Sequence, residues 1–198
     1  LRMGLVLLIL IPFWRFKIPE KKYFPALLAF SISMGVMVYV FMNLSLYHST
    51  IISPIILGSQ LAIPFGILAS ALILGENISS KKWIFILTAF VGILIIFFDP
   101  NLANNFLGLF FASLMALFFG LAQVYSRKLK NVNTSALNSS VAFFGFIILF
   151  IISYLIEGET ILNIRSISLD SWLLILYQAI VVSLCAHLLM FYLYKFYT

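Results

Sequence analysis

Gln60 and Pro64 stand four residues apart in an apolar stretch of this 198-residue sequence. A proline in a helix removes the hydrogen bond to the carbonyl four residues earlier, which here belongs to Gln60. A side-chain amide and an unpaired carbonyl would then meet within an apolar helix, and such a point is where a membrane protein can bind a polar ligand. The alternative is that Gln60 bonds a neighbouring helix and Pro64 only kinks its own helix. Pro54 is a second predicted kink in this stretch.

A polar stripe is predicted on the apolar run Phe24–Tyr47. Ser31, Gly35, Tyr39 and Asn43 follow one another at every fourth position, so they share one face of a helix. A polar face against lipid would be costly, and this stripe is therefore expected to face the interior of a helix bundle. Tyr39 and Asn43 become candidates for binding a ligand there, although hydrogen bonding between helices explains them equally well.

His187 lies on a helical line with Ala179 and Ser183. It is the only readily titratable side chain well inside an apolar run, so it is the candidate for coupling a function to protons. A histidine that only packs against its neighbours is the alternative. Further polar side chains within the runs are interior candidates, each of which could simply hold helices together: Ser59, Gln123, Asn138, Ser139, Ser140 and Gln178.

The chemistry that is absent from the sequence limits the function as well. It contains one cysteine, Cys185, and it lacks a glycine-rich phosphate loop, an HExxH pattern and the residue spacing of a metal site. No catalytic residue, metal ligand or cofactor is predicted, and the chain is not expected to be an enzyme.

The composition is that of an integral membrane protein. Of the residues, 64% are hydrophobic and 9% are charged, more apolar surface than a soluble domain of this length can bury. Apolar runs of this length must be helices, because lipid offers the backbone no hydrogen-bonding partner. We predict an all-α polytopic bundle of about seven transmembrane helices: Leu1–Trp14, Phe24–Tyr47, Ile51–Leu74, Trp83–Phe98, Phe106–Tyr125, Ala136–Ile156 and Trp172–Tyr194.

The positive charges indicate the orientation of these helices. Ten of the twelve Lys and Arg residues fall in alternate loops, and only Arg2 and Arg165 fall in the others. Cytoplasmic loops retain positive charge, so the ten mark the cytoplasmic side and the N-terminus is expected to be outside. The net charge of +6 thus reflects topology, and no nucleic-acid partner is predicted.

A short polar turn from Gly75 to Trp83 joins two of the predicted helices on the cytoplasmic side. Glu76 ends the first helix, where its charge opposes the helix dipole, and Lys81 or Lys82 is the nearest compensating partner. Ser79 or Ser80 can cap the second helix.

Two ridges of small residues predict close helix packing. One consists of Gly58, Ala62, Gly66 and Ser70, and the other of Gly108, Ala112, Ala116 and Gly120. Small side chains at every fourth position allow helices in a membrane to approach closely.

A weak internal repeat relates two of the runs. With an offset of 148 residues, Phe24–Thr50 aligns without a gap to Trp172–Thr198, and His187 falls on Tyr39. The two copies cross the membrane in opposite directions, as in many secondary transporters. The counterpart of Ile51–Asp99 would follow Thr198, so the sequence is expected to be part of a longer transporter.

The residues of the cytoplasmic turn also carry a resemblance to a known family. Leu72–Ser79 (LILGENIS), Lys82-Trp83 and Phe90–Ile96 (FVGILII) resemble the EamA domain of the drug/metabolite transporter superfamily, and Pro54 lies near a proline that this family often has. The resemblance implies ten helices in two inverted five-helix repeats. Residues 1–99 would end the first repeat and residues 100–198 would begin the second. Gln60 and the polar turn are most similar to the branch that exports cysteine and O-acetylserine-type metabolites.

The resulting expectation is a secondary transporter in the inner membrane of a bacterium. It would export amino acids or related small polar metabolites by alternating access around a midplane cavity lined by Gln60, Asn43, Tyr39, Gln178 and His187. Because no Asp, Glu, Lys or Arg lies deep in a run, hydrogen bonds would contribute more than charge to binding. A seven-helix receptor or sensor and a membrane-embedded enzyme are the alternative classes.

Overall fold

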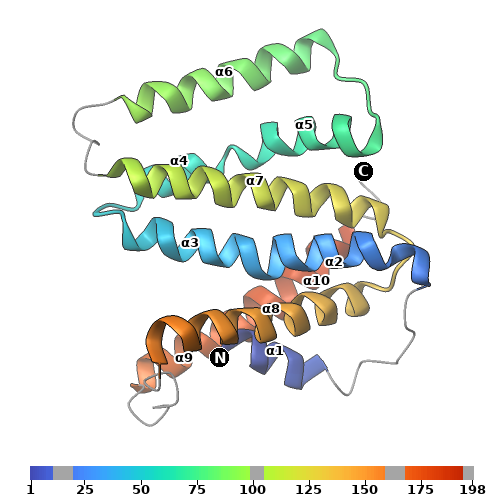
Figure 1. The fold of residues 1–198 in the computed structure, drawn as a ribbon, viewed down its shortest axis with the longest axis vertical. Coiled ribbons are helices and arrows are strands. Elements are labelled where there is room, and N and C mark those ends of the chain that lie inside the picture. The colour runs from blue at the N-terminus through green and yellow to red at the C-terminus, as the bar shows by residue number, and fades with distance from the viewer. Residues whose placement is uncertain (11–19, 99–104, 159–167, 194–198) are drawn as a thin grey trace. The chain divides into compact units, whose positions relative to one another are not determined.

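The computed structural model describes residues 1–10, 20–98, 105–158 and 168–193, and these residues form helices and short connections (Figure 1). The chain within these ranges contains no β-strand. The helical elements follow one another as α1 (Arg2–Leu10), η2 (Lys21–Tyr23), α2 (Phe24–Ile32), η3 (Ser33–Met37), α3 (Val38–Tyr47), α4 (Ser53–Ser59), α5 (Ala62–Leu74), α6 (Ser80–Phe97), α7 (Phe106–Lys128), α8 (Thr134–Glu157), α9 (Leu169–Tyr177), η7 (Gln178–Ala186) and α10 (His187–Leu193).

Six helical segments of the described chain are long and apolar enough to cross a membrane, so the protein is an all-helical, multi-pass membrane protein. They are Lys21–Tyr47, Ile55–Leu74, Ser80–Phe97, Phe106–Lys128, Thr134–Ile156 and Leu169–Leu193. Each corresponds to one predicted run. The seventh, Leu1–Trp14, is not among them: its described part is the nine-residue helix α1, and residues 11–14 lie outside the described residues.

The structure divides into two compact units. Unit 1 comprises residues 1–36 and 126–198, and unit 2 comprises residues 37–125. This division follows packing, whereas the predicted division at residue 99 follows from the family resemblance, so the boundary between the repeats stays a prediction.

In unit 2 the two predicted ridges of small residues pack against each other, where α4 and α5 run alongside α7 (Figure 1). A Cβ added to Gly58 would lie 2.8 Å from the Cβ of Ala112. One added to Gly120 would lie 2.8 Å from the backbone nitrogen of Gly66 and 2.9 Å from the carbonyl oxygen of Ala62. The predicted tight packing is confirmed, and its partners are now known.

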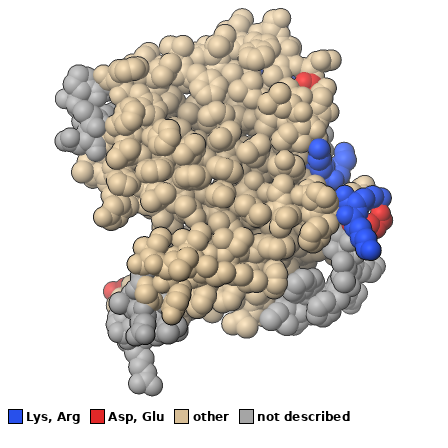
Figure 2. All heavy atoms as spheres, in the orientation of Figure 1, with Lys and Arg blue, Asp and Glu red and all other residues tan. Residues whose placement is uncertain are grey.

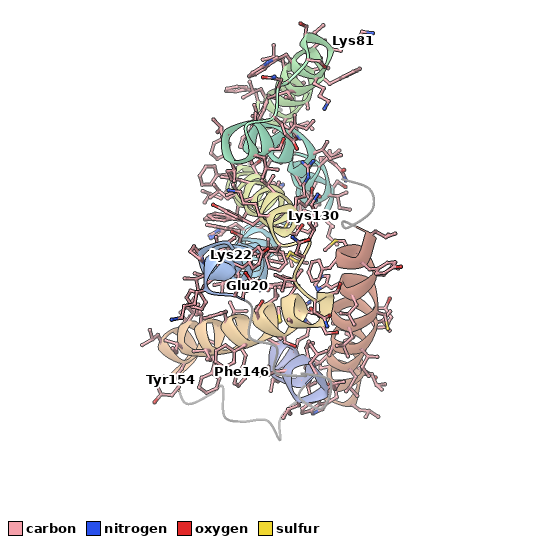
Figure 3. The ribbon with its side chains drawn as sticks, turned by 90° about the vertical axis from the view of Figure 1, so that its right-hand side faces the viewer. Glu20, Lys22, Lys81, Lys130, Phe146 and Tyr154 are labelled. Atoms are coloured by element: carbon pink, nitrogen blue, oxygen red, sulfur yellow. The ribbon has the colours of Figure 1, made fainter. Side chains whose placement is uncertain are left out.

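In unit 1 the helix α8 packs against α1, α2 and α10. Its Ala142 joins Val6, Leu10 and Ala179 in a buried apolar cluster. Phe146 of α8 lies toward α1 (Figure 3), where a Cβ on Gly4 would come within 3.0 Å of its ring.

Polar contacts in unit 1 join other parts of α8 to its neighbours. The Ser31 hydroxyl donates to that of Ser140 at 3.0 Å, and the Asn138 amide donates to the carbonyl of Ser183 at 2.9 Å. All four residues are buried, so these hydrogen bonds connect helices, which is the alternative that the sequence left open for Asn138 and Ser140.

The polar stripe on Phe24–Tyr47 does not lie on a single buried face. Ser31 and Gly35 are buried against α8, but Tyr39 is half-buried and Asn43 is exposed, with its amide donating to the Tyr39 carbonyl at 2.8 Å. The reason is the π-helical segment η3, whose wider turn shifts the register between Ser31 and Asn43. The prediction assumed one regular α-helix and is wrong for Asn43.

The sequence signals at the helix ends act as expected. Gly75 ends α5 in the left-handed conformation, with φ of 70°, and its N–H donates to the Ala71 carbonyl. Ser79 caps α6 by accepting from the N–H of Lys82, which confirms one of the two predicted caps. Asn133 and Ser168 cap α8 and α9 in the same way.

Within the six described spans, every charged side chain lies within three residues of a span end. The face drawn in Figure 2 is mostly uncharged, with Lys and Arg gathered at its edge. Figure 3 labels several of these positions, including Lys22, which forms an exposed ion pair with Glu20 at 2.6 Å. An exposed pair of this kind contributes little to stability.

Candidate functional site

The membrane span Ile55–Leu74 contains a break between α4 and α5. The first helix ends at Ser59, Gln60 and Leu61 form a turn, and the second begins at Ala62. Pro64 is in the first turn of α5, and it has no N–H to donate to the Gln60 carbonyl. The break therefore occurs where the proline predicts it.

The Gln60 carbonyl, however, is not unpaired. It accepts a hydrogen bond from the N–H of Ile63 at 3.3 Å, while the Gln60 N–H donates to the Leu57 carbonyl at 3.1 Å. Each of these bonds spans three residues, the pattern of a 3₁₀ turn, which satisfies backbone groups that an α-helix could not. The expectation of a free Gln60 carbonyl is wrong. The group of Gln60 that remains available to a ligand at the break is its side chain.

Pro54 does not kink a helix. It occupies the first turn of α4, where the N–H of a residue has no partner within the helix and a proline is tolerated. The sequence prediction extended the helix back to Ile51, which placed Pro54 in its interior.

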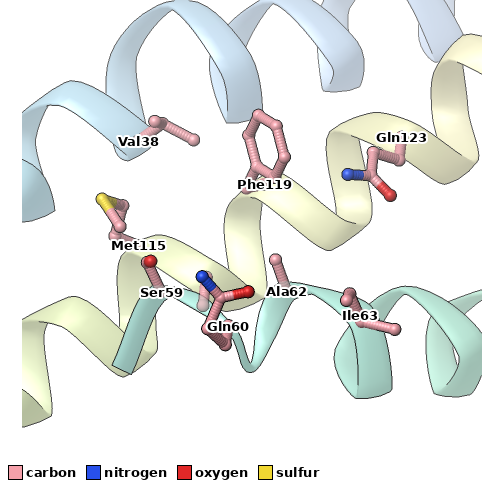
Figure 4. A pocket seen from close by; sticks show the side chains of 9 residues that line it. Val38, Ser59, Gln60, Ala62, Ile63, Met115, Phe119 and Gln123 are labelled. Carbon is pink, nitrogen blue, oxygen red and sulfur yellow. The ribbon is translucent and has the colours of Figure 1, made fainter. Parts of the chain in front are cut away.

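A pocket of about 380 Å³ opens beside the break (Figure 4). Its walls come from α3, from the break with the start of α5, and from α7: Val38, Ser59, Gln60, Ala62, Ile63, Met115, Ala116, Phe119 and Gln123. Met115 to Gln123 cover about 12 Å around the centre of the 23-residue helix α7. The pocket is therefore at middle depth in a membrane-spanning helix and belongs entirely to unit 2.

Three of the lining residues can form hydrogen bonds, and two of them carry carboxamides. The Ser59 hydroxyl donates to the carbonyl of Ile56 at 2.6 Å, so toward the pocket its oxygen can only accept. Gln60 is exposed at the edge of the pocket, and Gln123 extends from α7 into the same space (Figure 4). The other lining side chains are apolar.

Tyr39 and Asn43 do not line this pocket, although they belong to the same unit. From the neighbouring residues of α3 only Val38 does. The register shift at η3 explains this difference as well. The helix α3 presents the apolar Val38 to the pocket, where the predicted stripe would have placed a polar side chain.

Gln178 and His187 belong to unit 1. The Gln178 side-chain oxygen accepts from the Arg2 guanidinium at 3.2 Å, about 14 Å from the start of the span Leu169–Leu193. The Arg2 guanidinium therefore reaches a side chain nine residues into that span, although Arg2 itself is the first residue of α1. The His187 ring stacks on Phe191, which packs edge-on against Phe30.

The predicted polar turn is present between α5 and α6, and its location in the cytoplasm stays a prediction. Gly75, Glu76, Lys81, Lys82 and Trp83 are all exposed, and the last three are in the first turn of α6. The pairing of Glu76 with Lys81 or Lys82 stays a prediction.

The sequence marks the polar residues of the pocket only weakly and gives no direct signal for its apolar wall. The sequence predicts Ser59 and Gln123 to be interior polar residues that could bind a ligand or only hold helices together, and both line the pocket. Met115 and Phe119 gave no signal, because apolar residues on an apolar helix resemble lipid-facing ones. The small-residue ridge offered an indirect signal, since Met115 and Phe119 flank Ala116 of that ridge.

The fold and the pocket define a class, a multi-pass helical membrane protein with a largely apolar pocket at membrane depth that carries three polar side chains. Comparisons with protein-family models, with curated proteins and with solved structures gave no match for this chain.

Proposed function

We propose that the protein is a secondary transporter that exports small polar metabolites, such as amino acids or related compounds, by alternating access. The observation that supports this most is the broken helix α4–α5, which presents Ser59 and Gln60 to a pocket at the middle of α7. Transporters bind substrate at discontinuous helices near the bilayer midplane, where irregular backbone is tolerated only beside a cavity. A helix that serves only as an anchor has no need of such a break.

The packing of unit 1 agrees with an inverted repeat. In the repeat, α1 precedes the first copy and α8 precedes the second. The first-copy helix α2 packs against α8, and the second-copy segment η7 packs against α1. Each preceding helix thus contacts the other copy, as a pseudo-two-fold relation between the copies requires.

The two π-helical segments support the repeat independently. The offset of 148 residues carries Ser33–Met37 (η3) onto residues 181–185, which lie inside η7. Extended π-helix is rare, so its occurrence at matching positions is unexpected for unrelated helices.

The resemblance of Leu72–Trp83 to the EamA domain extends the proposal. It favours two inverted repeats divided near residue 99, a bacterial inner membrane with Gly75–Trp83 in the cytoplasm, and export as the direction of transport. These features follow from the resemblance and from the distribution of Lys and Arg.

A blocked pocket tests the proposal. Ile63 lines the pocket and is 65% exposed, so Ile63→Trp adds volume there without disturbing a packed core. The exported compound would first be identified from a radiolabelled panel of amino acids and their uncharged derivatives, in cells that express the full-length protein. We expect Ile63→Trp to reduce efflux of that compound at least about tenfold. Gln60→Ala is expected to reduce efflux about five- to tenfold, because one hydrogen bond to a ligand contributes about 1–1.5 kcal/mol.

Ile56→Trp is the matched control. Ile56 is 56% exposed on α4 and does not line the pocket, so the same substitution there should leave efflux unchanged at equal expression. Efflux that survives Ile63→Trp and Gln60→Ala would exclude this pocket as the transport site. Ligand binding with no flux in proteoliposomes would instead favour a receptor.

Proton coupling through His187 forms a separate prediction. The ring is half-buried in a span and stacked on Phe191. If His187 carries the coupling proton, His187→Gln should keep efflux but remove its response to an imposed pH gradient, measured in proteoliposomes. A full response in the variant would leave His187 with a packing role only.

A further inference from the structure

The pocket of unit 2 lacks an ionisable side chain in its lining. Its nine lining residues comprise two glutamines, one serine and six apolar residues. At membrane depth, a charge that enters such a site loses its hydration and gains no opposite charge in return. A ligand that carries a net charge, or separate ammonium and carboxylate groups, is disfavoured there.

The polar lining residues specify the hydrogen-bonding pattern of the ligand. Ser59 uses its proton on the Ile56 carbonyl, so a ligand group that faces Ser59 must donate. The Gln60 carboxamide offers both an oxygen acceptor and two N–H donors. A group with an N–H beside a C=O satisfies both residues at once, whereas a carboxylate, which only accepts, leaves Ser59 without a donor.

The apolar lining residues specify the rest of the ligand. Phe119 and Met115 extend from α7, and Val38 extends from α3 (Figure 4). An aromatic ring and a thioether favour a flat or aromatic partner. The volume of about 380 Å³ is within the range of small-molecule sites and too small for a peptide of several residues.

From these observations we infer that the ligand class of this pocket is an uncharged carboxamide or lactam carried on an apolar, preferably aromatic, body. The inference rests on the proposed function, because it identifies the substrate class of the same site. It narrows that function, since it disfavours zwitterionic amino acids and favours their neutral derivatives.

Benzamide and benzoate provide a matched pair of probes. They share a ring, a shape and almost the same size, and they differ in charge and in the presence of N–H donors. Binding of each radiolabelled compound to the full-length protein in lipid nanodiscs would be measured by equilibrium dialysis. We expect benzoate to bind at least about tenfold more weakly than benzamide, because the pocket holds no counter-charge. Equal affinity, tighter binding of benzoate or no binding of benzamide would overturn the inference.

Two variants at Gln60 make the test specific to the pocket. Gln60 is exposed, so neither substitution empties a packed core. Gln60→Leu should weaken benzamide at least about tenfold, and Gln60→Lys, which introduces a positive charge, should reverse the preference in favour of benzoate. Ile56→Trp, outside the lining, should change neither affinity. An unchanged preference in Gln60→Lys would contradict the inference.

The outcomes separate this inference from the proposed function. If efflux falls in Ile63→Trp but benzoate binds as well as benzamide, the transporter proposal stands and the ligand class is wrong. If the Gln60 variants change the preference for benzamide as expected but Ile63→Trp leaves efflux unchanged, the pocket has the inferred chemistry and does not lie on a transport route.

Discussion

Gly120→Ala is expected to reduce the free energy of unfolding by about 1–3 kcal/mol. We expect a loss in the upper part of this range, because the added methyl group would overlap backbone atoms. The added methyl would meet the backbone nitrogen of Gly66 at 2.8 Å and the Ala62 carbonyl at 2.9 Å. Neither atom belongs to a side chain that could rotate away, so α5 and α7 must separate. Denaturant unfolding of the full-length protein in detergent micelles measures the loss.

Two other glycines of unit 2 provide controls. A Cβ on Gly66 would have its nearest contact at 3.6 Å, an ordinary van der Waals distance, and a Cβ on Gly92 would meet nothing within 4 Å. We expect the variants Gly66→Ala and Gly92→Ala to unfold at nearly the same denaturant concentration as the parent protein. Equal losses at all three sites would mean that the helical glycines act through something other than close approach.

Pro64→Ala is expected to reduce efflux at least about tenfold while leaving the protein folded. The alanine N–H can donate to the Gln60 carbonyl, in place of the 3.3 Å bond from Ile63, so α4 and α5 can join in one α-helix. This change turns Gln60 away from its present position beside the pocket. In a continuous α-helix the Ile63 N–H would donate to the Ser59 carbonyl instead, so one backbone hydrogen bond is gained in total. It contributes about 1 kcal/mol, so unfolding should not become easier.

Pro54→Ala is the matched control, because Pro54 is in the first turn of α4, where no intrahelical bond awaits its N–H. Hydrogen exchange would report the structural part of the prediction, with greater protection at residues 60–64 in Pro64→Ala alone. If efflux is normal in a variant whose helix has become continuous, the break is not required for transport.

Most of the fold could be predicted because a membrane leaves the backbone few choices. Apolar runs of about 20 residues must be helices, and their ends follow from local signals such as Gly75 and Ser79. The partners of Gly58 and Gly120 could not be predicted, since a ridge of small residues states only that some helix approaches. The π-helical segment η3 could not be predicted either, because the sequence pattern from Ser31 to Asn43 agrees equally well with a regular α-helix.

The break in the helix at the candidate site could be predicted from the sequence, whereas most of the surrounding pocket could not. Gln60 and Pro64 located the break, because the missing N–H of a proline is a local property of the chain. Three features depend on how turns relax and on which helices meet: the hydrogen bond from the Ile63 N–H to the Gln60 carbonyl, the exposure of Asn43 and the contribution of Phe119 to the pocket. Such information arises only when the chain is packed in three dimensions.

The backbone contact between Gly120 and Gly66 has a consequence for the temperature dependence of this protein. In a bilayer, hydrocarbon surrounds both helices before they meet, so their association removes little apolar surface from water. The heat-capacity change of the contact should therefore be small, since that quantity follows from the hydration of apolar surface. Contacts between the cores of soluble proteins weaken on cooling, whereas α5 and α7 should hold together equally well in the cold.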